Sequence, residues 1–178
     1  MISVKVDITG ALKFLKVHLP RDIDSAAARA LTRTAASARK SAVATIKEQT
    51  SLPPKFIRDR LKIRGATGSN LTATITAMPG APNLARYTAR QTKHGVTAKA
   101  WKQRKLYRGA FIGNKGRTVF TRVGEARLPI KPLYGPSVRR TFMQDVAQQA
   151  MREAIEREFP KHFQSALAGI LARKGYRP

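Results

Sequence analysis

The sequence contains no cysteine, which excludes disulfide bonds, thiolate metal sites and cysteine nucleophiles. Its three histidines, His18, His94 and His162, are far apart, and none has a metal-ligand-like residue nearby in the sequence. We predict that all three are ordinary surface or half-buried histidines. Neither a metal ion nor any other cofactor is therefore expected.

Long apolar runs are also missing. No stretch approaches the ~18 consecutive apolar residues that a membrane-spanning helix needs. Met1–Asp7 alternates apolar and polar residues and lacks the charged-then-apolar layout of a signal peptide. These features predict a protein that is made in the cytoplasm and has no membrane partner.

Recognisable catalytic motifs are absent as well. There is no Gly-x-Ser-x-Gly nucleophile elbow, and Gly113–Gly116 lacks the Lys-Ser/Thr pair of a phosphate-binding loop. Glu153, Glu156 and Glu158 lie next to arginines on a helical segment, where surface ion pairs explain them. We expect no enzyme and no catalytic residue. The hydrolase alternative would need an unexpected site at Glu125 or His94.

Acidic residues are scarce, with 10 against 35 lysines and arginines, for a formal net charge of +25. Residues 60–124 contain 14 basic residues and no acid at all. A surface this positive attracts polyanions, and Lys99–Arg108 mixes cations with aromatic rings that can grip phosphates and stack on bases. The predicted polyanion-facing residues are Lys93, Lys99, Lys102, Arg104, Lys105, Arg108, Lys115, Arg117 and Arg122.

The alternative for this region is a solvated sheet face with Trp101 and Tyr107 in the core. Base-specific reading is not expected in either case, because no helix-turn-helix, zinc-finger or RNA-recognition signature is present.

The first part of the chain predicts one strand and a long helix. Residues 2–8 alternate as a half-buried strand does, and residues 12–19 suit a short helical turn. From about residue 25 to residue 49 the chain is rich in alanine and free of glycine and proline, which predicts a helix with an unusually small-sided apolar face. Pro53 and Pro54 end it, and a short second helix over 54–61 follows.

The middle of the chain has the two-residue period of strands. Strands are predicted over 71–77 and 96–101, a hairpin over 111–120 with a glycine-bearing turn, and an extended segment over 128–133. The last helical region starts after Ser137, which can cap it. Its apolar rows run through Phe142 and Val146 and through Met143 and Ala147, and Pro160 is predicted to kink or divide it.

These elements predict an α+β fold, in which an antiparallel β-sheet is packed by a long N-terminal helix and a kinked C-terminal helix. The expected organisation is one domain over residues 1–178, with a flexible basic loop or arm around 80–108.

Five segments also follow one another in an order that resembles a known family, over roughly residues 24–160. The segments are Ala26–Ala35, Lys55–Leu61, Gly109–Ile112 (GAFI), Arg127–Ile130 (RLPI) and Leu133–Val138 (LYGPSV). This succession resembles the minor tail protein Z family of tailed bacteriophages and their prophages. The motif residues are Gly109, Ala110, Phe111, Ile112, Pro129, Leu133, Tyr134, Gly135, Pro136 and Ser137.

The resemblance implies a structural virion protein with no catalytic residues. It would act in tail completion and head–tail joining at the head-proximal end of a long tail, the neck, after synthesis in the host cytoplasm. Related neck proteins have an α+β fold and form rings, commonly hexameric, through which DNA passes. The implied partners are further copies of the chain, tail terminator, tail tube or head-connector proteins, and genomic DNA in the channel.

The residues alone leave two points open. Gly135, Pro136 and Ser137 also fit a local turn followed by a helix cap, so a folding role explains them as well as an interface does. A soluble nucleic-acid-binding protein, ribosomal or nucleoid-like and without a virion role, would have a similar composition.

Overall fold

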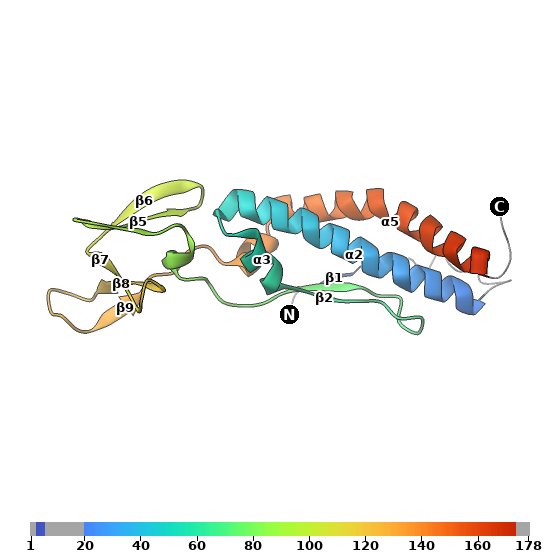
Figure 1. Cartoon of the computed structure of the whole chain (residues 1–178), viewed down its shortest axis with the longest axis horizontal. Helices are drawn as coiled ribbons and strands as arrows, with labels where there is room; N and C mark the ends of the chain where they lie inside the picture. The colour runs from blue at the N-terminus through green and yellow to red at the C-terminus, as the bar shows by residue number, and fades with distance from the viewer. Residues whose placement is uncertain (1–2, 6–19, 174–178) are drawn as a thin grey trace. The chain divides into compact units, whose positions relative to one another are not determined.

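The computed structural model describes residues 3–5 and 20–173, which fall into two compact units (Figure 1). The first unit combines three separate segments, Met1–Ala42, Leu61–Ala77 and Asp145–Pro178. The second combines Val43–Arg60 and Met78–Gln144. In each unit, therefore, segments that are far apart in the sequence share a core.

Two long helices form one part of the first unit: α2 (Pro20–Thr50), which continues into the second unit, and α5 (Asp145–Arg173). They lie side by side (Figure 1), and the Ser41 hydroxyl donates to the carbonyl oxygen of Ala150 at 2.9 Å. The buried face of α2 in this unit is mostly alanine: Ala26, Ala27, Ala28, Ala30, Ala35, Ala38 and Ala42. Such small side chains let neighbouring elements approach the helix closely.

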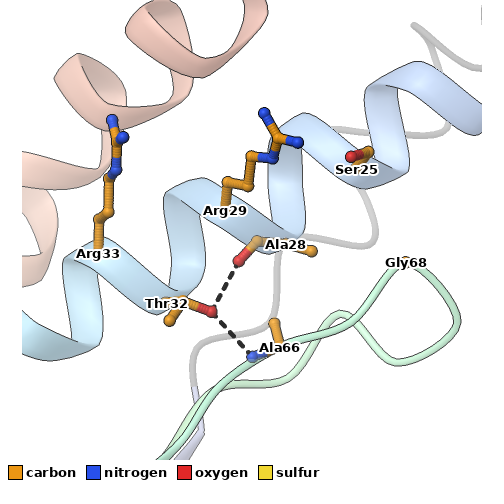
Figure 2. A pocket seen from close by; sticks show the side chains of 7 residues that line it. All are labelled: Ser25, Ala28, Arg29, Thr32, Arg33, Ala66 and Gly68. Atoms are coloured by element: carbon orange, nitrogen blue, oxygen red, sulfur yellow. Dashed lines mark hydrogen bonds between the residues drawn. The ribbon is translucent and has the colours of Figure 1, made fainter.

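A three-stranded antiparallel sheet completes the first unit, in the order β1 (Ser3–Lys5), β3 (Thr74–Ala77), β2 (Leu61–Arg64). Thr32 ties this sheet's loop to α2. Its hydroxyl donates to the Ala28 carbonyl at 2.9 Å and accepts from the Ala66 backbone N–H at 3.1 Å (Figure 2). The same hydroxyl therefore donates to a carbonyl of its own helix and accepts from a backbone N–H of the loop.

The second unit contains the C-terminal end of α2, two further three-stranded antiparallel sheets and three short helices. Its large buried side chains include Leu52, Ile57, Tyr87, Val119 and Phe142. The helices are α3 (Pro54–Arg60), η1 (Leu84–Arg86) and α4 (Val138–Phe142). The sheets are β4 (Arg90–Thr92), β5 (Gly95–Ala100), β6 (Gln103–Arg108), and β7 (Ala110–Gly113), β8 (Thr118–Arg122), β9 (Ile130–Pro132), each in that order.

The α+β class is confirmed, but the strands in the described residues form three small sheets where the sequence predicts one. The proline break is confirmed too, because α3 begins at Pro54. The predicted strand over 2–8 is described only at Ser3–Lys5, and the turn over 12–19 and His18 lie outside the described residues. The segment around 80–108, predicted as a flexible arm, carries η1 and β4–β6.

The predicted C-terminal helical region is two helices. Ser137 caps α4 by accepting from the Arg140 backbone N–H at 3.0 Å, but α4 ends at Phe142 and α5 begins at Asp145. The apolar row from Phe142 therefore does not continue, and Val146 is 58% exposed. Pro160 lies inside α5, so it removes one backbone donor without dividing the helix.

Candidate polyanion-binding surface

Positive charge is concentrated in the second unit. That unit contains 19 lysines and arginines against three acids, Glu48, Asp59 and Glu125, which gives it +16 of the chain's +25. Because so few carboxylates are available, internal ion pairs can neutralise little of this charge. A surface with this excess attracts polyanions over a distance of about 8 to 10 Å at ordinary salt concentrations.

All nine basic residues predicted from the sequence are exposed. Six of them belong to the β4–β6 sheet: Lys99 on β5, Arg104, Lys105 and Arg108 on β6, and Lys93 and Lys102 in the two connecting turns. The other three belong to the β7–β9 sheet, with Lys115 and Arg117 in the β7–β8 turn and Arg122 at the end of β8.

The register of β4–β6 determines which of these side chains share a face. Along β5, Val96, Ala98 and Ala100 are buried, so this face of the sheet covers the core. Side chains directly opposite each other on neighbouring strands share a face, and successive residues alternate. The pairs Arg90 with Thr97, Lys99 with Arg104 and Gly95 with Arg108 therefore belong to the opposite face, the outer face.

The outer face thus carries four exposed cations, Arg90, Lys99, Arg104 and Arg108. Arg90 is not among the residues predicted from the sequence, because Arg90–Thr92 of β4 are all exposed and carry no apolar signal for a strand. Lys105 lies on the other face, opposite Ala98.

One of these cations is held in position. The Arg104 guanidinium donates to the Thr97 hydroxyl at 3.2 Å, to the Thr88 hydroxyl at 3.4 Å and to the Thr88 carbonyl at 3.5 Å. Hydroxyl and carbonyl partners leave its positive charge unneutralised. A fixed guanidinium loses less side-chain entropy when it binds an anion than a mobile one does.

The turn between β5 and β6 presents an aromatic ring to solvent. Trp101 is 57% exposed, so its alternative placement in the core is wrong, whereas Tyr107 on β6 is half-buried. Trp101 and Lys102 both have positive φ, +51° and +64°, in a two-residue turn that normally favours asparagine and glycine. Residues other than glycine that are held at positive φ store backbone strain. Trp101 and Lys102 are both exposed, so burial of their side chains does not offset this strain.

Replacing Trp101 by Asn together with Lys102 by Gly is expected to stabilise the protein. The new residues adopt positive φ at little cost, so the free energy of unfolding should rise by about 1 to 2 kcal/mol. Thermal melting followed by circular dichroism would check this. Trp101→Ala alone is the control, because it removes the indole and retains the strain. A lower melting temperature for the double variant would show that the turn is not strained.

Trp101 also lines an open pocket of about 410 Å³ within the second unit, beside Gly135, Pro136 and Ser137. A second pocket, of about 400 Å³, lies in the first unit between α2 and the loop after β2. Figure 2 shows the pocket of the first unit, where the side chains of Arg29 and Arg33 point from α2 away from Ala66 and Gly68. Charged groups therefore do not converge across it.

The motif residues organise the core of the second unit. The Tyr87 ring is fully buried against Gly135, and its hydroxyl donates to the Pro136 carbonyl at 2.6 Å. Burial, together with nearby Tyr107, raises the pKa of Tyr87, so the hydroxyl stays protonated and can donate. Ser137 caps α4. Ser137 therefore has the predicted capping role, whereas Gly135 and Pro136 contact Tyr87 and form no assigned turn, and an interface role for the three residues stays a prediction.

Three of the remaining motif residues make contacts within and between the two sheets of the second unit. The Ile112 backbone N–H donates to the Gln91 side-chain oxygen at 2.8 Å, and Phe111 stacks on Phe120 with ring centroids 5.9 Å apart. The Leu133 N–H donates to the Val119 carbonyl at 2.9 Å. Ala110 is buried, Gly109 (φ +67°) links β6 to β7, Pro129 follows a cis peptide bond, and Tyr134 is exposed.

Within residues 3–5 and 20–173, no group of three or more acidic or histidine side chains is arranged to hold a metal ion. No helix in the same ranges is long and apolar enough to cross a membrane. Searches of curated proteins and of solved structures found no match. A family model, described as prophage minor tail protein Z (GPZ), matches residues 9–174, and the chain therefore belongs to the minor tail protein Z family of phage tail structural proteins.

Proposed function

We propose that the protein acts in tail completion and head–tail joining, as a subunit of a homo-oligomeric ring at the neck, close to the path of the DNA. The observation that carries this proposal is the family match over residues 9–174, which assigns a structural role in a phage tail and a place in the virion. The proposed ring is hexameric. Its neighbours are tail terminator, tail tube or head-connector proteins.

The charge of the second unit supports a position near DNA. Copies arranged in a ring bring units of +16 close together, and their mutual repulsion opposes assembly unless an anionic partner offsets it. DNA in a central channel would supply that negative charge. The mechanism is binding and geometry, and no reaction is involved.

The test is electron microscopy of particles from a phage with an early stop codon in this gene, with the gene supplied in trans as the control. We expect heads and tails that form but remain unjoined, or joined particles that are non-infectious with wrongly seated DNA. Supplying the gene should restore infectious particles. Normal, infectious particles from the stop mutant would contradict the proposal, and a soluble nucleic-acid-binding role would then replace it.

A further inference from the structure

We propose that the outer face of the β4–β6 sheet, with Arg90, Lys99, Arg104 and Arg108, binds the phosphate backbone of double-stranded DNA without sequence preference. This inference rests on the proposed function only for the place in the virion where the protein would encounter DNA. The surface itself is defined by the register of the sheet. It divides the basic residues into those that contact DNA and those that do not.

The positive charges on the outer face repel one another. Lys99 lies directly opposite Arg104, and like charges in directly opposed positions destabilise a sheet. In the described part of the chain, Arg90, Lys99 and Arg108 have neither an ion-pair nor a hydrogen-bond partner on their side chains. An anion bound across the face would relieve this repulsion, so the free sheet is set up for a polyanion.

The area that the four cations cover matches the phosphates on one side of a DNA duplex. With strands about 4.8 Å apart and a rise of about 3.3 Å per residue, the four cations span roughly 10 Å by 13 Å. Double-stranded DNA carries one charge per about 1.7 Å of axis, so a length of about 13 Å presents roughly seven or eight phosphates. About half of them face one side of the duplex, which matches four cations.

The composition of the outer face fits DNA better than it fits an acidic protein surface. Protein–protein interfaces are depleted of charged residues other than arginine at their centre, whereas protein–DNA interfaces are much more positively charged as a whole. The outer face has no acid, and Leu106 is its one exposed large apolar side chain. Contacts of this kind fix position on the backbone and carry no base information.

The experiment compares two variants of the full chain that lose the same charge. Lys99→Gln with Arg108→Gln removes two cations from the outer face, and Lys93→Gln with Lys105→Gln removes two from a turn and the other face. Both variants keep Arg104 and its hydrogen bonds. Binding is measured by fluorescence anisotropy with a labelled 30-base-pair duplex, at several salt concentrations and with two unrelated sequences.

The outer-face variant should bind the duplex about 10- to 100-fold more weakly, and the slope of log affinity against log salt should fall by about 1.8, or about 0.9 for each lost phosphate contact. The control variant should change affinity by less than about threefold, and both sequences should bind alike. Equal losses in the two variants would overturn the proposal, because the face would then not matter.

Two further measurements keep the outcome clear. If melting shows that either double variant is unfolded, Lys99→Gln and Lys105→Gln, one substitution on each face, repeat the comparison. Poly-glutamate is the second probe: binding to it that depends on the outer face, without binding to the duplex, would assign the surface to an acidic protein and overturn the DNA proposal. These results use purified protein, so they stand apart from whether the stop mutant makes normal particles.

Discussion

Replacing Gly135 by alanine is expected to lower the free energy of unfolding by about 3 kcal/mol or more and the melting temperature by about 6 to 12 °C. A Cβ at this position would lie 2.3 Å from Cε2 and 2.6 Å from Cζ of Tyr87. The ring cannot move aside easily, because it is fully buried and its hydroxyl is bonded to the Pro136 carbonyl. Thermal and urea denaturation would measure the loss.

Gly169→Ala is the matched control, because it adds the same methyl group with no atom within 4 Å, inside helix α5. It should stabilise the protein by about 0.5 to 1 kcal/mol, since alanine favours helix more than glycine does. Tyr87→Leu should partly relieve the cost of Gly135→Ala, so the two substitutions should not be additive. Gly135→Ala with an unchanged melting temperature would show that Tyr87 does not pack there.

Gly95→Ala is expected to be as damaging, for a different reason. Gly95 has φ +145°, which side chains rarely allow, and its added Cβ would lie 2.1 Å from the Tyr107 carbonyl oxygen and 3.0 Å from the Arg108 Cα. Because the obstacle is backbone, relief requires β5 and β6 to separate at this end. We expect a loss of about 3 kcal/mol or more, and faster hydrogen exchange of the β5–β6 amides.

The same substitution should weaken DNA binding, because Arg108 pairs with Gly95 on the proposed outer face. Gly68→Ala is the control, since it lies in an exposed loop with no atom within 4 Å and should change stability by less than about 0.5 kcal/mol. A Gly95→Ala variant that melts like the wild-type protein would show that Gly95 does not pair with Arg108.

Local patterns predicted the elements that have strong local causes. The alanine-rich run gives α2, Pro53 and Pro54 separate it from α3, and the glycine-bearing turn after Ile112 joins β7 to β8. The helix begins earlier than predicted, at Pro20, where proline is tolerated because a first-turn N–H has no helical partner.

The elements that were missed have no local signal. Strand β6 is exposed along nearly all its length, so it lacks the alternation of apolar residues that predicts a strand. The break at Met143 and Gln144 contains neither glycine nor proline, and apolar residues continue across it. The packing of Gly135 on Tyr87 joins residues far apart in the chain, and the membership of Arg90 in the outer face depends on pairing between strands.

The charged strand β6 has a consequence for the protein before assembly. It is an edge strand of its sheet, and an unpaired strand edge can recruit a strand from another molecule and start aggregation. Arg104, Lys105 and Arg108 place positive charge on both of its faces, so a second copy approaching edge to edge is repelled. The charge on β6 therefore protects this exposed edge, because two copies of it would have to bring like charges together in order to pair.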